Sequence, residues 1–258
     1  MSVIVVSGTG TEIGKTVVTA GLVALAAGRR VAVVKPAQTG VAAGEPGDLA
    51  EVRRLGGPAH GLELVRYPEP LAPATAARRA GVVGLDAERI ADRVAALAGA
   101  HDLVLVEGAG GLLVRFDERG ATLADAARLL AAPVLVVAAA GLGTLNAVAL
   151  TGEALRARGL DQLGVVVGSW PTAPGLAERC NLRDLPEAAG APLLGVVPEG
   201  AGGLAPAEFR SRAAGWFAPE LGGYWDAASF AAALDVDRGV LGDNSGAVGT
   251  EALAAALH

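Results

Sequence analysis

The chain has 258 residues, of which 52% are hydrophobic and 19% are charged, and its formal net charge is −6. This length suits one large domain, and the apolar composition argues against intrinsic disorder. The negative charge excludes a broad basic face for nucleic acid, and the single cysteine, Cys180, excludes an internal disulfide or a cysteine-ligated metal centre within one chain.

The first predicted element is a buried strand that leads into a glycine-rich loop. Residues 3–6 are short, apolar and β-branched, and Gly14-Lys15-Thr16 then opens a helical pattern from Val17. Strand, loop and helix in this order form the usual setting of a phosphate-binding loop, because backbone N–H groups and a helix N-terminus bind the anion. The preceding glycine is Gly8, so the loop is longer than the common G-x-x-x-x-G-K-[ST] spacing. We therefore favour nucleotide binding over an incidental glycine-rich turn.

A second strand is predicted at residues 30–36, and it brings Lys35 to the edge of the sheet where ligands bind in α/β folds. We expect Pro36 to end this strand, because proline cannot donate to the ladder. Position alone leaves Lys35 open between a ligand-binding role and a solvated strand end. Asp48 opens a short helix over residues 49–55, either as a plain N-cap or as a metal carboxylate.

The third predicted strand, residues 103–107, ends on a carboxylate. Glu107 stands where nucleotide-binding proteins hold Mg²⁺ or its waters, and Gly108 to Gly111 offer backbone donors for a second anion, unless they form only a tight turn. Before it, residues 58–73 are proline-rich and are interpreted as an irregular surface excursion. Helices are predicted at residues 74–80 and 86–98.

The rest of the chain continues the alternation of strands and helices. A helix is predicted at residues 122–130, a strand at 133–138, a loop at 141–146, a helix at 147–158, and strands at 163–168 and 192–197. The pattern predicts the α/β class, with a mostly parallel sheet flanked by helices on both faces. Residues 129–152 carry no charge, but the prolines, glycines and polar residues within them argue against a membrane span.

The domain boundaries and the compartment follow from the same pattern. Residues 1–230 are expected to form a single domain, and residues 231–258 a tail that is peripheral or flexible. The apolar run at residues 3–6 is too short for the core of a signal peptide. Together with the lone cysteine, this predicts a cytoplasmic protein that does not bind a membrane.

Residues 3–197 resemble the ATP-dependent dethiobiotin synthetases, which act in biotin biosynthesis. Four stretches carry the resemblance: the extended phosphate loop at residues 8–16, Lys35-Pro36 with Thr39-Gly40, the Glu-Gly-Ala-Gly-Gly run at residues 107–111, and the Gly-x-x-Asn loop at residues 143–146. The phosphate loop alone would not separate this family from its relatives.

The resemblance implies a P-loop homodimer with a site shared across its interface. In it, 7,8-diaminononanoate reacts with CO₂ or bicarbonate and ATP, with Mg²⁺, to give dethiobiotin through a carbamate and a carbamic-phosphoric anhydride. The implied catalytic residues are Lys15, Lys35 and Thr11, and the implied Mg²⁺ ligands are Thr16, Asp48 and Glu107. The implied substrate contacts are Thr39, Gly110, Gly111, Thr144, Leu145 and Asn146, with Asn146 acting in the partner's site. The implied nucleotide contacts are Gly10, Thr11, Glu12, Ile13, Gly14, Lys15, Thr16, Val17, Gly168, Ser169, Pro198, Glu199 and Gly200.

The residue after the fifth predicted strand departs from the family. An Asn that both donates to and accepts from adenine is expected there, but this chain has Ser169. A serine hydroxyl does not reproduce the paired contact of an amide. The backbone of residues 198–200 remains as a generic contact to the base edge, so we expect other nucleoside triphosphates to support the reaction.

Three other functions are compatible with a phosphate loop. A dimeric partitioning or positioning switch ATPase carries a second lysine near the start of the loop, whereas this chain has Thr9-Gly10-Thr11. An iron–sulfur reductase of the same superfamily requires two ligating cysteines. An amide-forming synthetase acting on cobyrinate-type substrates normally adds a glutaminase domain, for which this chain has no room or motif.

Overall fold

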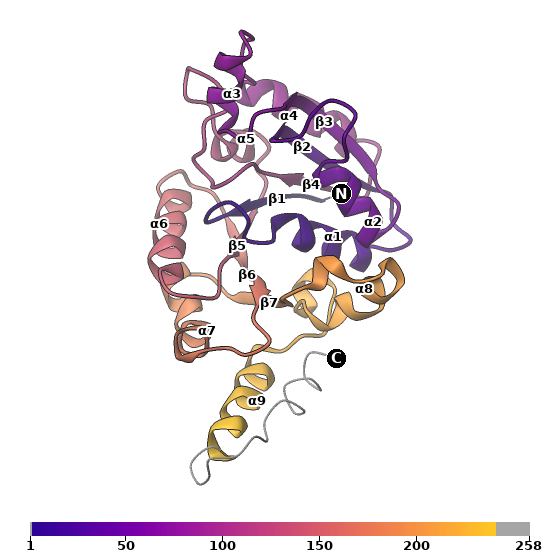
Figure 1. The fold of residues 1–258 in the computed structure, drawn as a ribbon. Coiled ribbons are helices and arrows are strands. Elements are labelled where there is room, and N and C mark those ends of the chain that lie inside the picture. The colour runs from indigo at the N-terminus through magenta and orange to yellow at the C-terminus, as the bar shows by residue number, and fades with distance from the viewer. Residues whose placement is uncertain (1, 241–258) are drawn as a thin grey trace.

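The computed structural model describes residues 2–240, which form a single parallel sheet covered by helices (Figure 1). The sheet has seven strands in the order β3-β2-β4-β1-β5-β6-β7, and every pair of neighbouring strands is parallel. The predicted α/β class is confirmed. The strands are β1 (Ser2–Gly8), β2 (Val31–Thr39), β3 (His60–Tyr67), β4 (Leu103–Glu107), β5 (Val134–Ala138), β6 (Gln162–Trp170) and β7 (Leu193–Pro198).

The helices lie on both faces of the sheet because the early strands are added toward one edge and the later strands toward the other. Connections from β1 to β2 to β3 run one way and those from β4 to β7 run the other, so right-handed crossovers place their helices on opposite faces. Figure 1 shows α1, α2 and α8 on one side of the strands and α6 and α7 on the other. The α-helices are α1 (Lys15–Leu25), α2 (Asp48–Gly56), α3 (Pro73–Arg79), α4 (Ala87–Ala98), α5 (Leu123–Leu129), α6 (Thr144–Arg156), α7 (Leu176–Ala189), α8 (Pro206–Arg212) and α9 (Ala227–Val240).

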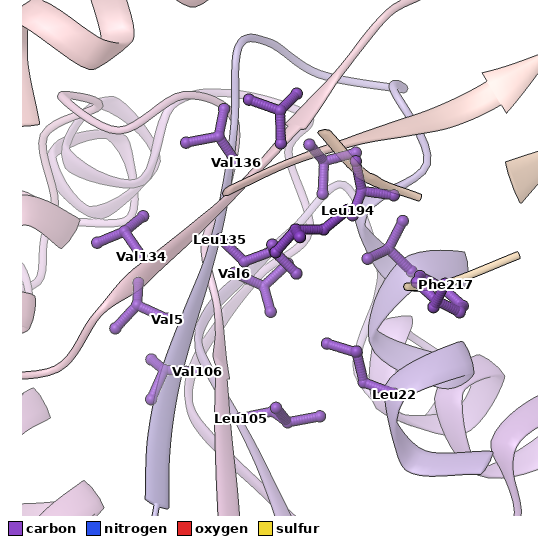
Figure 2. Close-up of a cluster of buried hydrophobic side chains, with 14 of the residues drawn as sticks. Val5, Val6, Leu22, Leu105, Val106, Val134, Leu135, Val136, Leu194 and Phe217 are labelled. Atoms are coloured by element: carbon purple, nitrogen blue, oxygen red, sulfur yellow. The ribbon is translucent and has the colours of Figure 1, made fainter. Parts of the chain in front are cut away.

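The core lies on the central strands, whose side chains are buried on both faces. Val6 of β1, Leu105 of β4 and Leu135 of β5 have no exposed surface, and Figure 2 shows them in one cluster with α1. α1 approaches this core closely because Gly21 has no side chain: a Cβ there would lie 2.4 Å from Cε2 of Phe217. Continuous apolar strands of this kind are typical of a parallel sheet covered on both faces.

The interpretation of residues 58–73 as an irregular excursion is wrong in its first half. β3 (His60–Tyr67) is an edge strand that pairs in parallel with β2 from Ala32 to Thr39. Its residues are mostly half-buried, and prolines flank it at Pro58 and Pro68, which made the segment look like a loop. An edge strand gains its structure from one neighbour, and that pairing is not visible in local composition.

Pro36 does not end the second strand, as the sequence had suggested. β2 continues to Thr39, and Pro36 lies inside it. The register with β4 ends at Val34, while the register with β3 continues from Ala37. Proline is tolerated here because the ladder on one side of β2 has already ended.

The predicted loop at residues 141–146 is shorter than expected. α6 begins at Thr144, and its N-cap is Gly143 with a left-handed φ of 88°. The polar residues Thr144 and Asn146, which suggested a loop, form the first turn of the helix. The strand predicted at residues 163–168 is longer than expected, because β6 continues two residues beyond Gly168, to Trp170.

The charge-free segment at residues 129–152 contains the end of α5, all of β5 and the start of α6. Within residues 2–240, no helix combines the length and the apolar character needed to cross a bilayer.

The predicted domain boundary at residue 231 falls within α9. Phe230 packs on the ring of Trp170 with centroids 5.6 Å apart, and Leu234 is buried. Residues 241–258, the remainder of the predicted tail, lie outside the described part of the chain.

Candidate functional site

The loop between β1 and α1 curls around the start of the helix. Gly14 is the N-cap of α1, with φ 90°, and Glu12 also has a left-handed φ of 56°. A Cβ on Gly14 would lie 2.3 Å from the carbonyl oxygen of Gly168, so only glycine fits there. Lys15 spans the loop and donates from Nζ to the carbonyl of Gly10 at 2.6 Å. Among residues 2–240, no side chain caps α1, so its first N–H groups remain available to an anion.

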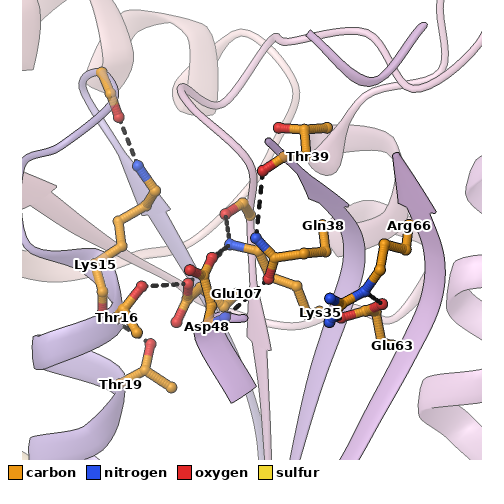
Figure 3. Close-up of polar contacts among 12 residues, drawn as sticks. Lys15, Thr16, Thr19, Lys35, Gln38, Thr39, Asp48, Glu63, Arg66 and Glu107 are labelled. Carbon is orange, nitrogen blue, oxygen red and sulfur yellow. Dashed lines mark hydrogen bonds and ion pairs between the residues drawn. The ribbon is translucent and has the colours of Figure 1, made fainter. Parts of the chain in front are cut away.

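An ion-pair cluster lies beside this loop, at the carboxyl end of β4 and at the point where β2 stops pairing with it (Figure 3). Lys35 and Glu107 are buried in it, and Asp48 is half-buried. Nζ of Lys35 contacts Oδ2 of Asp48 at 2.5 Å and Oε1 of Glu107 at 2.9 Å. It also donates to the carbonyl of Gly108 at 3.0 Å. The three protons of the ammonium group therefore have three acceptors. We call Lys35, Asp48 and Glu107 the Lys35 cluster.

The cluster joins the phosphate loop through Thr16. The Thr16 hydroxyl donates to Oε1 of Glu107 at 2.9 Å, which is the same oxygen that Lys35 contacts. The other carboxylate oxygen of Glu107, Oε2, is buried and has no hydrogen-bond partner among the described residues. A buried carboxylate oxygen without a partner is costly, so this atom is suited to a cation or a bound donor.

The two lysines of the site differ in their electrostatic environment. Burial alone would lower the pKa of Lys35, but the carboxylates of Glu107 and Asp48 outweigh it and raise the pKa above the usual value for lysine. Burial lowers the pKa of Lys15 to about 8, and the positive charge of Lys35 adds to this effect. Lys35 is therefore a permanent cation, whereas the charge of Lys15 depends on pH near neutrality and on what binds beside it.

A cavity of about 630 Å³ opens at this edge of the sheet. Part of its lining is polar and combines the phosphate loop with the Lys35 cluster, and another part is apolar. The sequence-predicted residues that line the cavity are Thr11, Glu12, Gly14, Lys15, Thr16, Lys35, Thr39, Asp48, Glu107 and Gly110. The structure thus brings residues from separate motifs to one cavity.

The other predicted residues of the phosphate loop, and Gly111 after β4, adjoin the residues that line the cavity. Gly10 is the acceptor for Lys15, and Val17 follows Thr16 in α1. The backbone of Ile13 packs on Gly168, where an added Cβ would lie 2.0 Å from the Ile13 carbonyl oxygen. Gly111 approaches the end of β1, with its ideal Cβ position 3.5 Å from the carbonyl oxygen of Gly8.

The residues predicted to contact the base lie on the other side of the start of α1 and do not line this cavity. Gly168 and Ser169 are in β6, next to Gly14 of the phosphate loop. Pro198 pairs with Trp170, and the backbone N–H of Glu199 donates to the carbonyl of Trp170 at 2.7 Å. The predicted Gly200 follows with a left-handed φ of 78°.

The predicted substrate contacts at the start of α6 also lie outside the cavity of the single chain. Thr144 is buried, and its hydroxyl donates to the carbonyl of Ala139 at 2.7 Å. Leu145 packs against the core, whereas Asn146 is exposed on the helix surface. Within one chain, these residues do not meet the Lys35 cluster.

The donor set fits Mg²⁺. Thr16 offers a hydroxyl and Asp48 and Glu107 offer carboxylates, which are the hard oxygen ligands that Mg²⁺ prefers. Within the described residues, no group of three or more His, Cys, Asp or Glu side chains is arranged to hold a metal. One or two carboxylates nevertheless suffice for Mg²⁺ where phosphate and water complete the shell. Asp48 is not the N-cap of α2, because Gly47 occupies that position.

Sequence reasoning missed two features of the cavity. The first is Gln38, which is buried and accepts a hydrogen bond from the backbone N–H of Asp48. No local signal marked it, because Gln38 lies beyond Pro36, where the strand was expected to end. The second is the apolar wall, formed by residues 70–73 with Val41 and Val114. No local signal marks this wall, because its members come together only through the tertiary fold.

Comparison with known proteins places the chain among close relatives. Residues 2–202 match a protein family described as an AAA domain. The ATP-dependent dethiobiotin synthetase BioD of Streptomyces avermitilis is 64% identical over 236 residues, which cover 91% of this chain and 99% of the relative. The protein of the same name from Saccharopolyspora erythraea is 67% identical, over 87% of this chain and 99% of the relative.

Solved structures share the fold at low identity. A ParA family ATPase from Chlorobium tepidum TLS has a TM-score of 0.52 at 16% identity and covers 81% of this chain and 90% of its own. The MinD cell division protein of Aquifex aeolicus has a TM-score of 0.51 at 15% identity and covers 96% of this chain and 100% of its own. At such identities, the likeness concerns the fold alone.

Proposed function

This chain belongs to the ATP-dependent dethiobiotin synthetase family, whose members are ligases, and from this premise we propose that it converts 7,8-diaminononanoate to dethiobiotin. One observation carries the proposal beyond family membership. Lys15, Lys35 and Glu107, which come from three separate motifs, meet at one cavity with a polar and an apolar wall. The polar wall suits phosphates and a carbamate, and the apolar wall suits an aliphatic chain.

The proposed chemistry needs no protein nucleophile. One amine of the substrate adds to CO₂ and loses a proton, which gives a carbamate. A carbamate oxygen attacks the γ-phosphorus of the nucleotide, and the diphosphate leaves. The second amine then attacks the carbonyl carbon of the mixed anhydride, phosphate leaves and the ureido ring closes. The protein contributes positioning and charge stabilisation.

The lysines take the main electrostatic roles. Lys15 exchanges its contact with the Gly10 carbonyl for the β- and γ-phosphates. Lys35 is held charged by Glu107 and Asp48, so it stabilises the carbamate and the transferring phosphoryl group. Thr11, Thr39 and the Gly110 backbone border the same space and position the reacting end.

Thr16, Asp48 and Glu107 would hold Mg²⁺, which neutralises charge on the nucleotide phosphates when bound. The unpartnered Oε2 of Glu107 supports this role, since a cation would satisfy it. The backbone of residues 10–17 would hold the triphosphate itself. Gly168, Ser169 and the loop at residues 198–200 border the other side of the phosphate loop, where we place the base.

The substrate carboxylate is assigned to a second chain. Asn146 and the backbone of Thr144 and Leu145 stand at the exposed start of α6, away from the cavity of their own chain. A homodimer that brings this helix start to the partner's cavity would complete the site. We further propose a cytoplasmic enzyme in which residues 1–230 hold the active site and residues 231–258 are peripheral to it.

The test is product formation from purified protein. Diaminononanoate, bicarbonate, Mg²⁺ and a nucleoside triphosphate should together yield dethiobiotin, and omission of any one should abolish it. Absence of product with every nucleotide would refute the proposal.

A switch ATPase remains the second candidate because ParA and MinD share the fold. The phosphate loop argues against it, since residues 9–11 contain no second lysine. One assay distinguishes the two functions. A switch ATPase would release phosphate at a rate that does not depend on the diamine or on bicarbonate, whereas the synthetase would require both.

A further inference from the structure

The helix α2 begins without a capping side chain of its own. Its N-cap is Gly47, which has no side chain to accept a hydrogen bond from the first turn. A larger residue would have to displace the ends of two side chains, because a Cβ on Gly47 would lie 2.6 Å from Oε1 of Gln38 and 3.0 Å from a guanidinium nitrogen of Arg66. The acceptor for the first turn must therefore come from elsewhere in the fold.

Gln38 of β2 supplies that acceptor. Its Oε1 accepts a hydrogen bond from the backbone N–H of Asp48 at 2.9 Å. The amide nitrogen of Gln38, Nε2, donates to the carbonyl of Thr39 at 3.4 Å, so both the oxygen and the nitrogen of the amide have a hydrogen-bond partner. Gln38 is only 4% exposed, which gives its side chain little freedom to turn away.

The loop that precedes Asp48 is held from β3 as well. The guanidinium group of Arg66 donates to the carbonyls of Ala42 at 3.0 Å and Glu45 at 2.7 Å. Glu63 orients that guanidinium group through two hydrogen bonds, at 2.6 and 2.8 Å. The segment from Ala42 to Asp48 is therefore tied to two strands, to β3 through Arg66 and to β2 through Gln38.

These contacts decide where the Asp48 carboxylate lies. Asp48 is the first residue of α2, and its side chain is 33% exposed, so packing alone does not fix it. Its backbone N–H is held by Gln38, and its carboxylate contacts Lys35. A fraying first turn would move this carboxylate away from the Lys35 cluster.

We propose that Gln38 is a positioning residue for the site: it caps α2 and thereby fixes Asp48 as a carboxylate of the Mg²⁺ site. The part of this inference that concerns Mg²⁺ rests on the proposed function. Partners of metal ligands commonly change metal affinity by about tenfold or more when they are removed.

The first measurement is amide hydrogen exchange on the wild-type protein. The N–H of Asp48 should be protected, although it belongs to the first turn of a helix. Gln38→Met keeps the size of the side chain and removes the acceptor, and it should speed exchange at Asp48 by about tenfold. Gln38→Glu keeps an acceptor oxygen and should restore protection. An unprotected Asp48 amide in the wild type would overturn the proposal without any variant.

The second measurement is Mg²⁺-dependent binding of a non-hydrolysable ATP analogue by calorimetry. Gln38→Met should raise the Mg²⁺ concentration for half-maximal binding by about tenfold, and Gln38→Glu should reverse most of this rise. Thr122→Val is the matched control, because Thr122 caps α5 far from Asp48 in the chain and lines no part of the cavity. It should leave the Mg²⁺ requirement unchanged.

An unchanged Mg²⁺ requirement in Gln38→Met, or an equal rise in Thr122→Val, would overturn the positioning role. Neither measurement needs turnover. Failure to form dethiobiotin would therefore refute the proposed function and leave this test intact.

Discussion

Replacing Lys35 with methionine isolates the energetic role of the buried cation. Methionine has a similar length and no N–H donors, so Lys35→Met leaves Glu107, Asp48 and the Gly108 carbonyl without their shared partner. Glu107 is 1% exposed, and its Oε2 already has no hydrogen bond within the described chain. After the substitution, the Thr16 hydroxyl would be the one donor to this carboxylate that remains in the described part of the chain.

The expected loss of stability is large because one partner of a buried ion pair is removed. Such changes cost about 3 to 5 kcal/mol, most of it from the uncompensated charge that remains. For a domain of this size, we expect Tm to fall by about 6 to 20 °C. The same variant should lower kcat by at least about 10²-fold, since Lys35 stabilises charge in the transition state.

The assay is urea and thermal unfolding in the presence of a chelator, so that no cation neutralises the carboxylates. Arg30→Met is the control, because the Arg30–Asp102 pair is exposed on both sides and screened by solvent, so its loss should change stability much less than the loss of Lys35. In Lys35→Met/Glu107→Gln, the buried charge is removed as well, so part of the stability should return. A loss below about 1 kcal/mol in Lys35→Met, or strict additivity in the double variant, would refute this account of the cluster.

Three further predictions concern binding and assembly. Burial, with the positive charge of Lys35, lowers the pKa of Lys15 to about 8. The charge of Lys15 is lost as pH rises through that value, so the Kd for ATP should rise by up to about tenfold per pH unit above about 8. A Kd that is constant from pH 7 to 10 would contradict this prediction. Dimers that combine one Asn146→Ala chain with one Lys15→Ala chain should recover activity at one of their two sites, whereas no recovery would mean that Asn146 acts within its own chain. With Ser169 beside the nucleotide base, kcat/KM for CTP, GTP and UTP should lie within about tenfold of the value for ATP. A preference for ATP above about 10²-fold would reveal base contacts that Ser169 does not supply.

Those parts of the site that depend on local pattern could be predicted from the residues alone. β1, the phosphate loop and α1 are contiguous, and their apolar run, glycines and helical period are readable without the fold. Lys35 and Glu107 each follow an apolar run of a strand, and the parallel pairing of Val34 with Val106 places the two residues side by side. Their convergence was therefore predictable, although their contact distances were not.

Features that depend on partners distant in the sequence could not be predicted in this way. Residues 60–67 become a strand because β2 offers an edge to pair with, and their own flanking prolines argue for a loop. Gln38 caps α2 because the connection from β2 doubles back and brings the backbone N–H of Asp48 to its side chain. Residues 70–73 line the same cavity as the Lys35 cluster, although they are distant from Lys35 in the sequence. Periodicity and capping rules act over a few residues, whereas strand pairing and cavity shape arise from chain segments that meet only after folding.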